Sequence, residues 1–389
     1  MDRPRFMVGG GGYLWPRMGP QPLRVLVVGQ TPPPFGGQAV MIGHMLNGAS
    51  DRVRYHHVRL AFSDDMESVG KFRIRKILVL FSTIARVIIA RFRYGTLVLY
   101  YPPSGPNMVP VLRDLIFLCA TRWLFRSTVF HFHASGVSTF KHRLPRFLQP
   151  LFRWAYGRPA LAIRTAEQNP NDGAALGASR SIVVPNGLPD MRGTVPERTA
   201  PPQGPFTILF TGVLIPSKGV LVLLEAFKLV CDRGIDVQLE VMGKWGDEHF
   251  KRTCDEFVAQ QGLSERVRFL GVKRDKEKNL HFAACDVFCF PSYFEAESFG
   301  LVVAEAMQFA KPVVSTQWRG IPSVVEDGAS GFLVPIKDAT AVADRLAALL
   351  CDAALRKRMG EAGRRIFEER FTLHRFHQRM EEAFLSLRP

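Results

Sequence analysis

The chain has 389 residues, of which 47% are hydrophobic and 11% aromatic, a composition that excludes a disordered protein. Single cores rarely grow beyond roughly 250–300 residues, so this length predicts two domains. The net charge of +16 lies wholly in the first half: residues 1–200 hold 26 Lys and Arg against 10 Asp and Glu, whereas residues 201–389 hold 25 of each kind. This asymmetry predicts a polyanionic partner for the first half, either an anionic membrane surface or a nucleic acid.

Cysteine spacing and hydropathy indicate where the protein works. The 6 cysteines form no C-x-x-C pair and no zinc spacing, which favours a reducing cytosol. The longest apolar run, residues 77–90, contains Arg86 and is shorter than the roughly 20 residues that a spanning helix needs, so no membrane span is predicted. Residues 1–20 are glycine-rich and lack an apolar stretch, which predicts a loose tail rather than a signal peptide.

Strands and helices alternate in the first half. A buried strand at 24–29 precedes a Pro/Gly loop at 30–38 and a helix through Leu46. Further strands are predicted at 53–60, 96–101, 128–133, 160–164 and 181–184, with helices at 71–93 and 109–125 and a basic, aromatic segment at 140–156. The alternation predicts a parallel, doubly wound sheet in residues 21–188. The prolines of residues 189–205 predict a linker.

A second α/β series follows the linker. Strands are predicted at 206–212, 237–243, 267–270, 286–290, 312–315 and 331–334, and helices at 218–233, 246–260, 300–309, 340–350 and 355–369, with a short helix ending at 284. The series predicts a second Rossmann-like domain at 206–370 and, in residues 371–389, a helix that could pack back on the first domain. Two such domains predict a cleft between them, where these folds bind ligands beyond the carboxyl ends of the strands.

The strand-to-helix loop before residue 301 carries the clearest sign of a site. Glu297 follows a buried strand, the backbone N–H groups of residues 299–301 are predicted to open a helix, and Glu305 lies about two turns inside it. A helix N-terminus attracts anions, and carboxylates suit sugar hydroxyls, so the stretch predicts a sugar-nucleotide site. The alternative is a capped helix with two solvated acids.

The glycine pair Gly36-Gly37 marks a second candidate site. A strand that feeds a Gly-Gly loop at a helix start makes an anion or ligand site at the carboxyl edge of the sheet. The loop lacks G-x-G-x-x-G, so a dinucleotide site is weakly supported, and a simple turn is the alternative.

Several motifs occur together in a fixed order. They are G-G at 36–37, H-F-H-A-S-G at 131–136, P-N-G at 185–187, F-T-G-V-L-I-P-S-K-G-V at 210–220, V-R-F-L-G-V at 267–272, the E-x7-E pair of Glu297 and Glu305, and E-D-G-A-S-G-F-L-V at 326–334. With these motifs the chain resembles the family 4 glycosyltransferases of the GT-B fold, in which two doubly wound domains face each other across a cleft. The resemblance covers residues 23–370 and is densest in the C-terminal half.

The resemblance implies a retaining transfer from a nucleoside-diphosphate sugar, with no metal and no further cofactor. The implied catalytic residues are His133, which would contact the sugar or the leaving phosphate, and Glu297, which would bind the sugar hydroxyls. The implied diphosphate contacts are Gly36, Gly37, Lys218, Ser298, Phe299, Gly300 and Leu301. Glu305 would bind the ribose, and the loop of Gly271, Val272 and Lys273 would lie against the base. The nucleotide β-phosphate would take the acceptor proton, so no side chain is assigned as general base.

The chain departs from the family pattern at several positions. Val213 stands where the family often has Arg after glycine, which leaves Lys218 more of the diphosphate charge. Ser323 stands where many members have Glu, and Arg319 could supply missing charge. His131 should face the same side of its strand as His133, so either histidine could be the contact.

Basic residues alternate with aromatic ones over residues 140–158, and a basic cluster at 71–76 precedes the apolar run. Such surfaces suit anionic lipid, although a solvated basic face is the alternative. The sequence thus predicts a peripheral glycosyltransferase on the inner face of the plasma membrane that extends a polysaccharide or lipid-linked glycan with a hexose. The rivals are a GT-B sugar-nucleotide epimerase and a catalytically silent binding protein. A nucleic-acid partner is not expected, because no nucleic-acid-binding motif is present.

Overall fold

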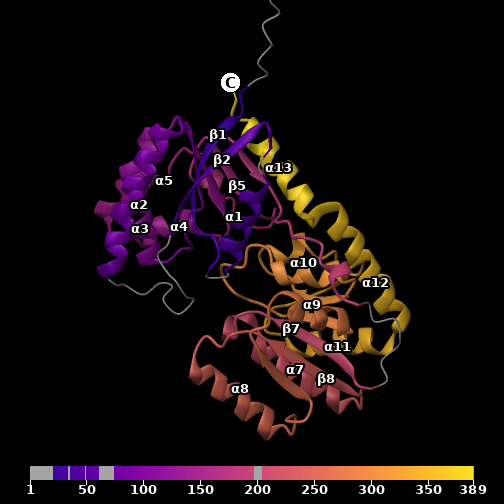
Figure 1. Ribbon diagram of the computed structural model, residues 1–389. Coiled ribbons are helices and arrows are strands. Elements are labelled where there is room, and N and C mark those ends of the chain that lie inside the picture. The colour runs from indigo at the N-terminus through magenta and orange to yellow at the C-terminus, as the bar shows by residue number, and fades with distance from the viewer. Residues whose placement is uncertain (1–20, 34–35, 49, 61–73, 197–203, 389) are drawn as a thin grey trace, which may run out of the picture.

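Two parallel β-sheets organise the chain in a computed structural model that describes residues 21–33, 36–48, 50–60, 74–196 and 204–388 (Figure 1). The first sheet has the strand order β2-β1-β3-β4-β5-β6, and the second has the order β12-β11-β10-β7-β8-β9. All the paired strands run parallel. The predicted α/β architecture with two doubly wound sheets is confirmed.

Elements of the first sheet follow the predicted alternation closely. The strands are β1 (Leu23–Gly29), β2 (Val53–Arg59), β3 (Val98–Tyr101), β4 (Ser127–Phe132), β5 (Leu161–Arg164) and β6 (Ser181–Val183). The helices are α1 (Gly37–Asn47), α2 (Ile74–Arg93), α3 (Met108–Thr121), α4 (Val137–Phe140), α5 (Gln149–Tyr156) and α6 (Asp172–Ala175). None of the helices within the described ranges has both the length and the apolar composition needed to cross a membrane.

Helices cover both faces of the first sheet. In β1, Leu26 and Val28 pack with α2, α3 and α5, whereas Val25 and Val27 pack with α1 and the C-terminal helix α13 (Leu373–Leu385). Side chains that alternate between two covered faces explain why residues 25–28 of this strand are apolar without interruption. Figure 1 shows α2, α3 and α5 together on one side of the sheet and α1 and α13 on the other.

The second sheet forms the other core. Its strands are β7 (Phe206–Thr211), β8 (Val237–Met242), β9 (Val267–Gly271), β10 (Val287–Phe290), β11 (Val313–Thr316) and β12 (Gly331–Val334). Its helices are α7 (Val220–Asp232), α8 (Glu248–Gln260), α9 (Asp275–Ala284), α10 (Leu301–Gln308), α11 (Ala339–Cys351) and α12 (Ala353–Ile366). A single hydrophobic cluster joins these elements around the fully buried Phe210, Phe227 and Phe288.

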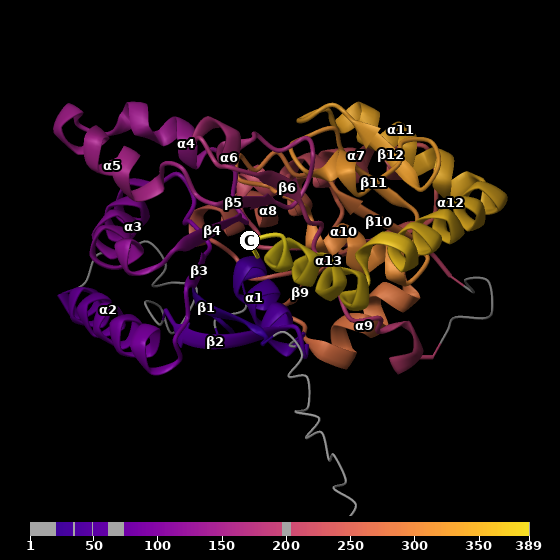
Figure 2. The same cartoon turned by 90° about the horizontal axis from the view of Figure 1, so that it is seen from above.

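The chain passes between the two sheets twice, and the two passages lie side by side. The N–H of Leu188 donates to the carbonyl of Phe371, and the N–H of Leu373 donates to the carbonyl of Leu188, both at 2.8 Å. After the second passage, α13 lies against the first sheet, with Phe376 and Phe384 buried in the core that also holds Val25 and Val27 (Figures 1 and 2). The last helix therefore ties the two halves of the chain together, while the predicted domain boundaries stay a prediction.

Asp114 of α3 is the centre of a buried polar cluster in the first core. It is fully buried and accepts hydrogen bonds from the Tyr101 hydroxyl at 2.7 Å, from the N–H and hydroxyl of Ser104 at 2.8 and 2.7 Å, and from the Tyr156 hydroxyl at 3.1 Å. The guanidinium of Arg113 pairs with it at 2.8 Å. The cluster joins β3, α3 and α5, so it fixes the position of α5 against the sheet.

Two predicted helices were wrong in detail, and the basic, aromatic segment at 140–156, for which no helix was predicted, consists of short elements. It holds the end of α4, two short 3-10 turns and α5. Pro145 lacks the N–H that a continuous helix would need, and Pro150 lies in the first turn of α5, where no N–H donor is needed. The helix predicted at 109–125 ends at Thr121 and continues as a 3-10 turn. The helix predicted at 355–369 spans 353–366 and ends in a π-helical turn at 367–371.

Candidate functional site

The loop between β10 and α10 turns sharply before the helix begins. Gly300 occupies the N-cap with a φ of 78°, and Leu301 is the first helical residue. Phe299 lies before the helix, and its buried ring packs edge-on against Phe371 at 5.3 Å between centroids. The prediction that residues 299–301 all open the helix was therefore wrong for Phe299, whose ring anchors the loop instead.

Glu297 of this loop forms an ion pair with Lys218, which lies in the turn before α7. Glu297 is 8% exposed, and its Oε2 accepts a hydrogen bond from Lys218 Nζ at 2.6 Å and another from the Ser292 hydroxyl at 3.0 Å. The Lys218 ammonium also lies 4.5 Å from the centre of the Phe294 ring, a distance at which a cation is attracted to an aromatic face. The pair places a fixed cation and a fixed carboxylate next to each other. A ligand that carries both phosphate and hydroxyl groups could bind the cation through its phosphate and the carboxylate through its hydroxyls.

Gly219 allows Lys218 to reach Glu297. Lys218 ends the 3-10 turn Pro216–Lys218, and Gly219 follows in the left-handed conformation with a φ of 79°. A Cβ at Gly219 would lie 2.1 Å from the carbonyl oxygen of Pro291, so any other residue would push this turn away from the β10–α10 loop. The S-K-G motif thus holds the ammonium against the carboxylate.

His131 of β4 and His133, just past its end, lie on one side of the strand, as predicted, with ring centroids 4.0 Å apart. His131 is fully buried, and its Nδ1 is hydrogen-bonded to the Tyr100 hydroxyl at 2.8 Å. His133 lies just past the strand, partly exposed as a residue, with its Nε2 buried and without a hydrogen-bond partner. Burial lowers the pKa of His133 to about 3 and the pKa of His131 well below its usual value, so both rings are neutral at pH 7. The Nε2 of His131 also lacks a hydrogen-bond partner, but His131 is fully buried in the core, so His133 is the histidine that a ligand could reach.

Ser298 connects the two domains directly beside this histidine. Its hydroxyl donates to the carbonyl of His133 at 2.6 Å, and its own carbonyl accepts from the Thr165 hydroxyl at 2.8 Å and from Asn169 Nδ2 at 2.7 Å. The Ser298 side chain therefore bridges the domains in this state instead of pointing at a ligand.

The Gly36-Gly37 loop meets the start of α10. Gly36 is the N-cap of α1 and Gly37 its first residue, and a Cβ on Gly37 would lie 3.2 Å from Leu301 Cδ1. A Cβ on Gly36 would meet nothing within 4 Å, so the backbone there borders open space. The N-termini of two helices from different domains thus face each other near the Lys218–Glu297 pair, which is a favourable arrangement for a diphosphate.

The predicted ribose and base contacts lie farther along the second domain. Glu305 Oε1 accepts a hydrogen bond from Lys278 Nζ at 2.6 Å, so a ribose would meet a carboxylate already held in place. Gly271 has a φ of 67° with open space at its Cβ position, and Val272 is 52% exposed. Lys273 pairs with Glu277 on α9. The loop is free to receive a flat group, and these assignments stay predictions.

The three departures from the family pattern have different structural settings. Val213 is 38% exposed and presents no charge. Arg319 has a φ of 52°, stacks its guanidinium over Trp318 at 5.1 Å and leaves its buried Nε without a partner. The Ser323 hydroxyl contacts the Gln168 side chain of the first domain. Next to Arg319, a Cβ on Gly320 would lie 2.0 Å from the Ser298 carbonyl, so glycine is required there.

Sequence reasoning missed four polar residues that hold the site together. They are Ser292, Lys278, Thr165 and Asn169. Ser292 could have been found from its place two residues after the buried strand β10, where residues of doubly wound folds line the cleft. The other three contact residues 27 to 133 positions away in sequence, and nothing local signals such a contact. Among the described residues no three His, Cys, Asp or Glu side chains group as metal ligands, and a metal-independent reaction stays a prediction.

Comparison with solved structures defines the class of fold. The chain superposes on the crystal structure of Anabaena HepE in complex with UDP with a TM-score of 0.71 and 19% identity, over 94% of this chain and 100% of that one. Sucrose-phosphate synthase from Thermosynechococcus elongatus matches with a TM-score of 0.69 and 18% identity, over 94% and 98% of the two chains. The fold is GT-B, as predicted.

Sequence comparison shows which family the second half of the chain resembles. Residues 192–366 match the family model described as glycosyl transferases group 1. The chain is 38% identical over 191 residues to a phosphatidyl-myo-inositol mannosyltransferase of Mycobacterium leprae, and 36% identical over 157 residues to a D-inositol 3-phosphate glycosyltransferase of Corynebacterium glutamicum. These matches cover 49% and 40% of this chain and 49% and 37% of the relatives, so the alignment spans about half the length of the curated relatives or less.

Proposed function

We propose that the chain is a retaining glycosyltransferase that moves a hexose-type sugar from a nucleoside-diphosphate sugar to a polysaccharide or lipid-linked glycan acceptor at the cytoplasmic face of the membrane. The observation that carries this proposal is the Lys218–Glu297 ion pair beside two facing helix N-termini. Such termini attract a diphosphate, the ammonium adds positive charge, and the carboxylate can accept sugar hydroxyls. Relatives named as mannosyltransferases of a phospholipid support a sugar donor and a lipid-borne acceptor.

Each group would have a distinct task in the transfer. The amides at Gly37 and Leu301 and the Lys218 ammonium would stabilise the charge that develops on the leaving diphosphate. Glu297 would orient the sugar, with its other carboxylate oxygen free to accept hydroxyls. The neutral His133 would donate or accept one hydrogen bond at the sugar, since a group with its pKa held near 3 carries no charge at pH 7.

Donor binding tests the proposal. In a panel of UDP-, GDP-, ADP- and dTDP-sugars, one nucleotide is expected to raise the melting temperature by several degrees, because a ligand at 100 times its Kd stabilises the native state by about 2.7 kcal/mol. Differential scanning fluorimetry at fixed protein concentration measures the shift. A panel in which no sugar nucleotide stabilises the protein would contradict the proposal.

Two rival functions give different products from the same donor. An epimerase would convert the donor sugar without an acceptor, which NMR of the incubated nucleotide sugar detects. A silent binding protein would be stabilised by the donor but release no nucleoside diphosphate. Transfer or slow donor hydrolysis, with the sugar configuration otherwise unchanged, is the result expected here.

We further propose that the first domain docks on an anionic membrane through the face formed by α2, α3 and α5. Of the 16 exposed large hydrophobic side chains among the described residues, 13 lie between residues 77 and 154. Those on α2, α3, α5 and the adjoining turns are Ile77, Leu78, Phe81, Ile89, Phe92, Met108, Val109, Ile116, Trp123, Phe147, Leu151 and Trp154. Figures 1 and 2 both show α2, α3 and α5 side by side at the outer edge of the first domain. Exposed apolar side chains among arginines suit an anionic bilayer.

Liposome flotation tests the docking face. The protein is expected to float with vesicles that contain about 30% phosphatidylglycerol and not with pure phosphatidylcholine. The double variant Phe81→Ser/Phe92→Ser should bind at least about tenfold more weakly, because a buried aromatic side chain contributes roughly 1.5–3 kcal/mol. Leu280 is an exposed apolar residue of the second domain, so Leu280→Ser is the control and should float like the parent protein. Equal recovery with neutral and anionic vesicles would rule the docking out.

A further inference from the structure

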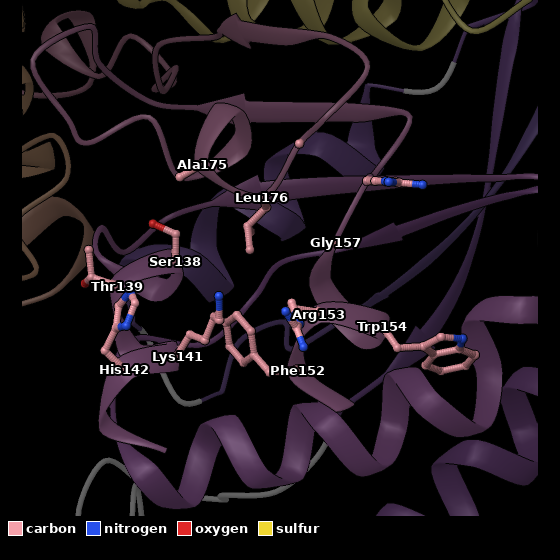
Figure 3. Close-up of a pocket in the computed structure, with 12 residues that line it drawn as sticks. Ser138, Thr139, Lys141, His142, Phe152, Arg153, Trp154, Gly157, Ala175 and Leu176 are labelled. Atoms are coloured by element: carbon pink, nitrogen blue, oxygen red, sulfur yellow. The ribbon is translucent and has the colours of Figure 1, made fainter. Parts of the chain in front are cut away.

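The first domain contains a cavity of about 770 Å³ between α4, α5 and the end of α6. Its wall includes Ser138, Lys141, Phe152, Arg153, Arg158 and Leu176 (Figure 3). All of the residues that line it lie between positions 138 and 177, and none belongs to the predicted donor site. The cavity is therefore separate from the predicted donor site.

The charge of the cavity is strongly positive. Lys141, Arg153 and Arg158 line it, and no Asp or Glu does. Among the described residues these three side chains have no ion-pair partner, although Lys141 is half-buried. A half-buried cation without a partner loses hydration and gains nothing in return, so an anion in the cavity would be bound favourably.

The arginines are not needed to cap α5. The guanidinium of Arg122 already binds the carbonyls of Trp154, Ala155 and Arg158 at 2.8 to 3.0 Å, which satisfies the C-terminal end of that helix. Arg153 and Arg158 therefore have no structural task at the helix end, and their charges are available to a ligand.

The cavity adjoins the proposed docking face. Trp154 lines the cavity and is 50% exposed, and Leu151, one turn earlier on α5, is 40% exposed. Figure 3 shows Lys141 and Arg153 on either side of the Phe152 ring, with Trp154 projecting from the same helix. A molecule with an anionic head and apolar chains would place its head among the cations and its chains across Trp154.

We propose that this cavity binds the phosphate-bearing headgroup of a membrane lipid, whose chains remain in the bilayer under α5. The inference rests on the membrane docking proposed above and not on the donor chemistry. Such a cavity would make membrane docking selective for a phosphorylated lipid, whereas a merely basic surface would bind any anionic bilayer.

Isothermal titration of the full chain with monomeric dihexanoyl phosphatidic acid tests the proposal. One molecule is expected to bind per chain, at least about tenfold more tightly than glycerol 3-phosphate or inorganic phosphate. Arg153→Gln/Arg158→Gln should weaken binding of the short-chain lipid by at least about tenfold, since each lost cation removes part of the attraction. Lys141→Gln is a second variant that leaves α5 untouched and should weaken binding in the same direction.

Arg143→Gln/Arg146→Gln is the matched control, because both arginines are exposed, lie in the same segment and do not line the cavity. It removes the same charge and should change the affinity by less than about twofold. An equal loss in both double variants would show a diffuse charge effect and overturn the proposal. Equally tight binding of inorganic phosphate would overturn the lipid assignment. If the unmodified chain binds the short-chain lipid but no nucleotide sugar, the proposed transferase function is contradicted and the cavity assignment still holds.

Discussion

Glu297→Ala is expected to lower kcat/KM for sugar transfer by about 10² to 10³, with little change in overall folding. The carboxylate is 8% exposed and holds Lys218 Nζ at 2.6 Å, so its loss removes the sugar contact and also releases the ammonium that faces the diphosphate. The loss of one fixed electrostatic contact in a buried site typically lowers the rate by about 10² to 10³. Steady-state kinetics with the nucleotide sugar chosen from the panel measure the loss.

A control and a conservative variant separate chemistry from structure. Glu295 is an exposed acid two residues earlier, and Glu295→Ala should retain full activity. Glu297→Gln keeps the shape of the side chain and the Ser292 hydrogen bond but removes the charge opposite Lys218. Its kcat/KM should therefore lie between the values of the parent protein and Glu297→Ala. If Glu297→Ala keeps more than about a tenth of the parent's kcat/KM, the assignment of this residue is wrong.

The order of elements was predictable because each strand is a short apolar run. Residues 25–29 and 287–290 are buried, and strands that are covered on both faces show in the sequence as continuous hydrophobic stretches next to Gly or Pro. No helix was predicted in segment 140–156, and its short helices follow each other around Pro145 and Pro150. The start of α10 was placed too early because a left-handed Gly300 separates Phe299 from the helix, and sequence alone does not report a φ angle.

The residues of the site could be predicted from the sequence, but the contacts between their side chains could not. Lys218 and Glu297 were assigned separately to the diphosphate and the sugar, and the structure places their side chains in direct contact across 79 positions of sequence. The Ser298–His133 bridge spans 165 positions and depends on how the two domains face each other. Long-range contacts of this kind follow from the fold, and a single sequence contains no local signal for them.

Asp114→Ala is expected to lower the free energy of unfolding of the first domain by about 3–5 kcal/mol, and its melting temperature by roughly 10 °C. Asp114 is fully buried and accepts from the Tyr101 and Tyr156 hydroxyls and from Ser104. Burial, reinforced by the charge of Asp114, raises the pKa of both tyrosines well above the usual value, so both hydroxyls stay protonated donors. Without the carboxylate these donors stay buried and unsatisfied.

Urea unfolding followed by circular dichroism measures the change, and hydrogen exchange locates it, with faster exchange expected in α3 and α5. Asp344→Ala is the control, because its ion pair with Arg233 is exposed on the second domain and contributes little. Since α5 carries Arg153 and Trp154, a loosened α5 should also weaken vesicle binding while nucleotide-sugar binding in the second domain persists. If Asp114→Ala is as stable as Asp344→Ala, the polar cluster does not hold α5 in place, and another interaction must position α5 in the docking face.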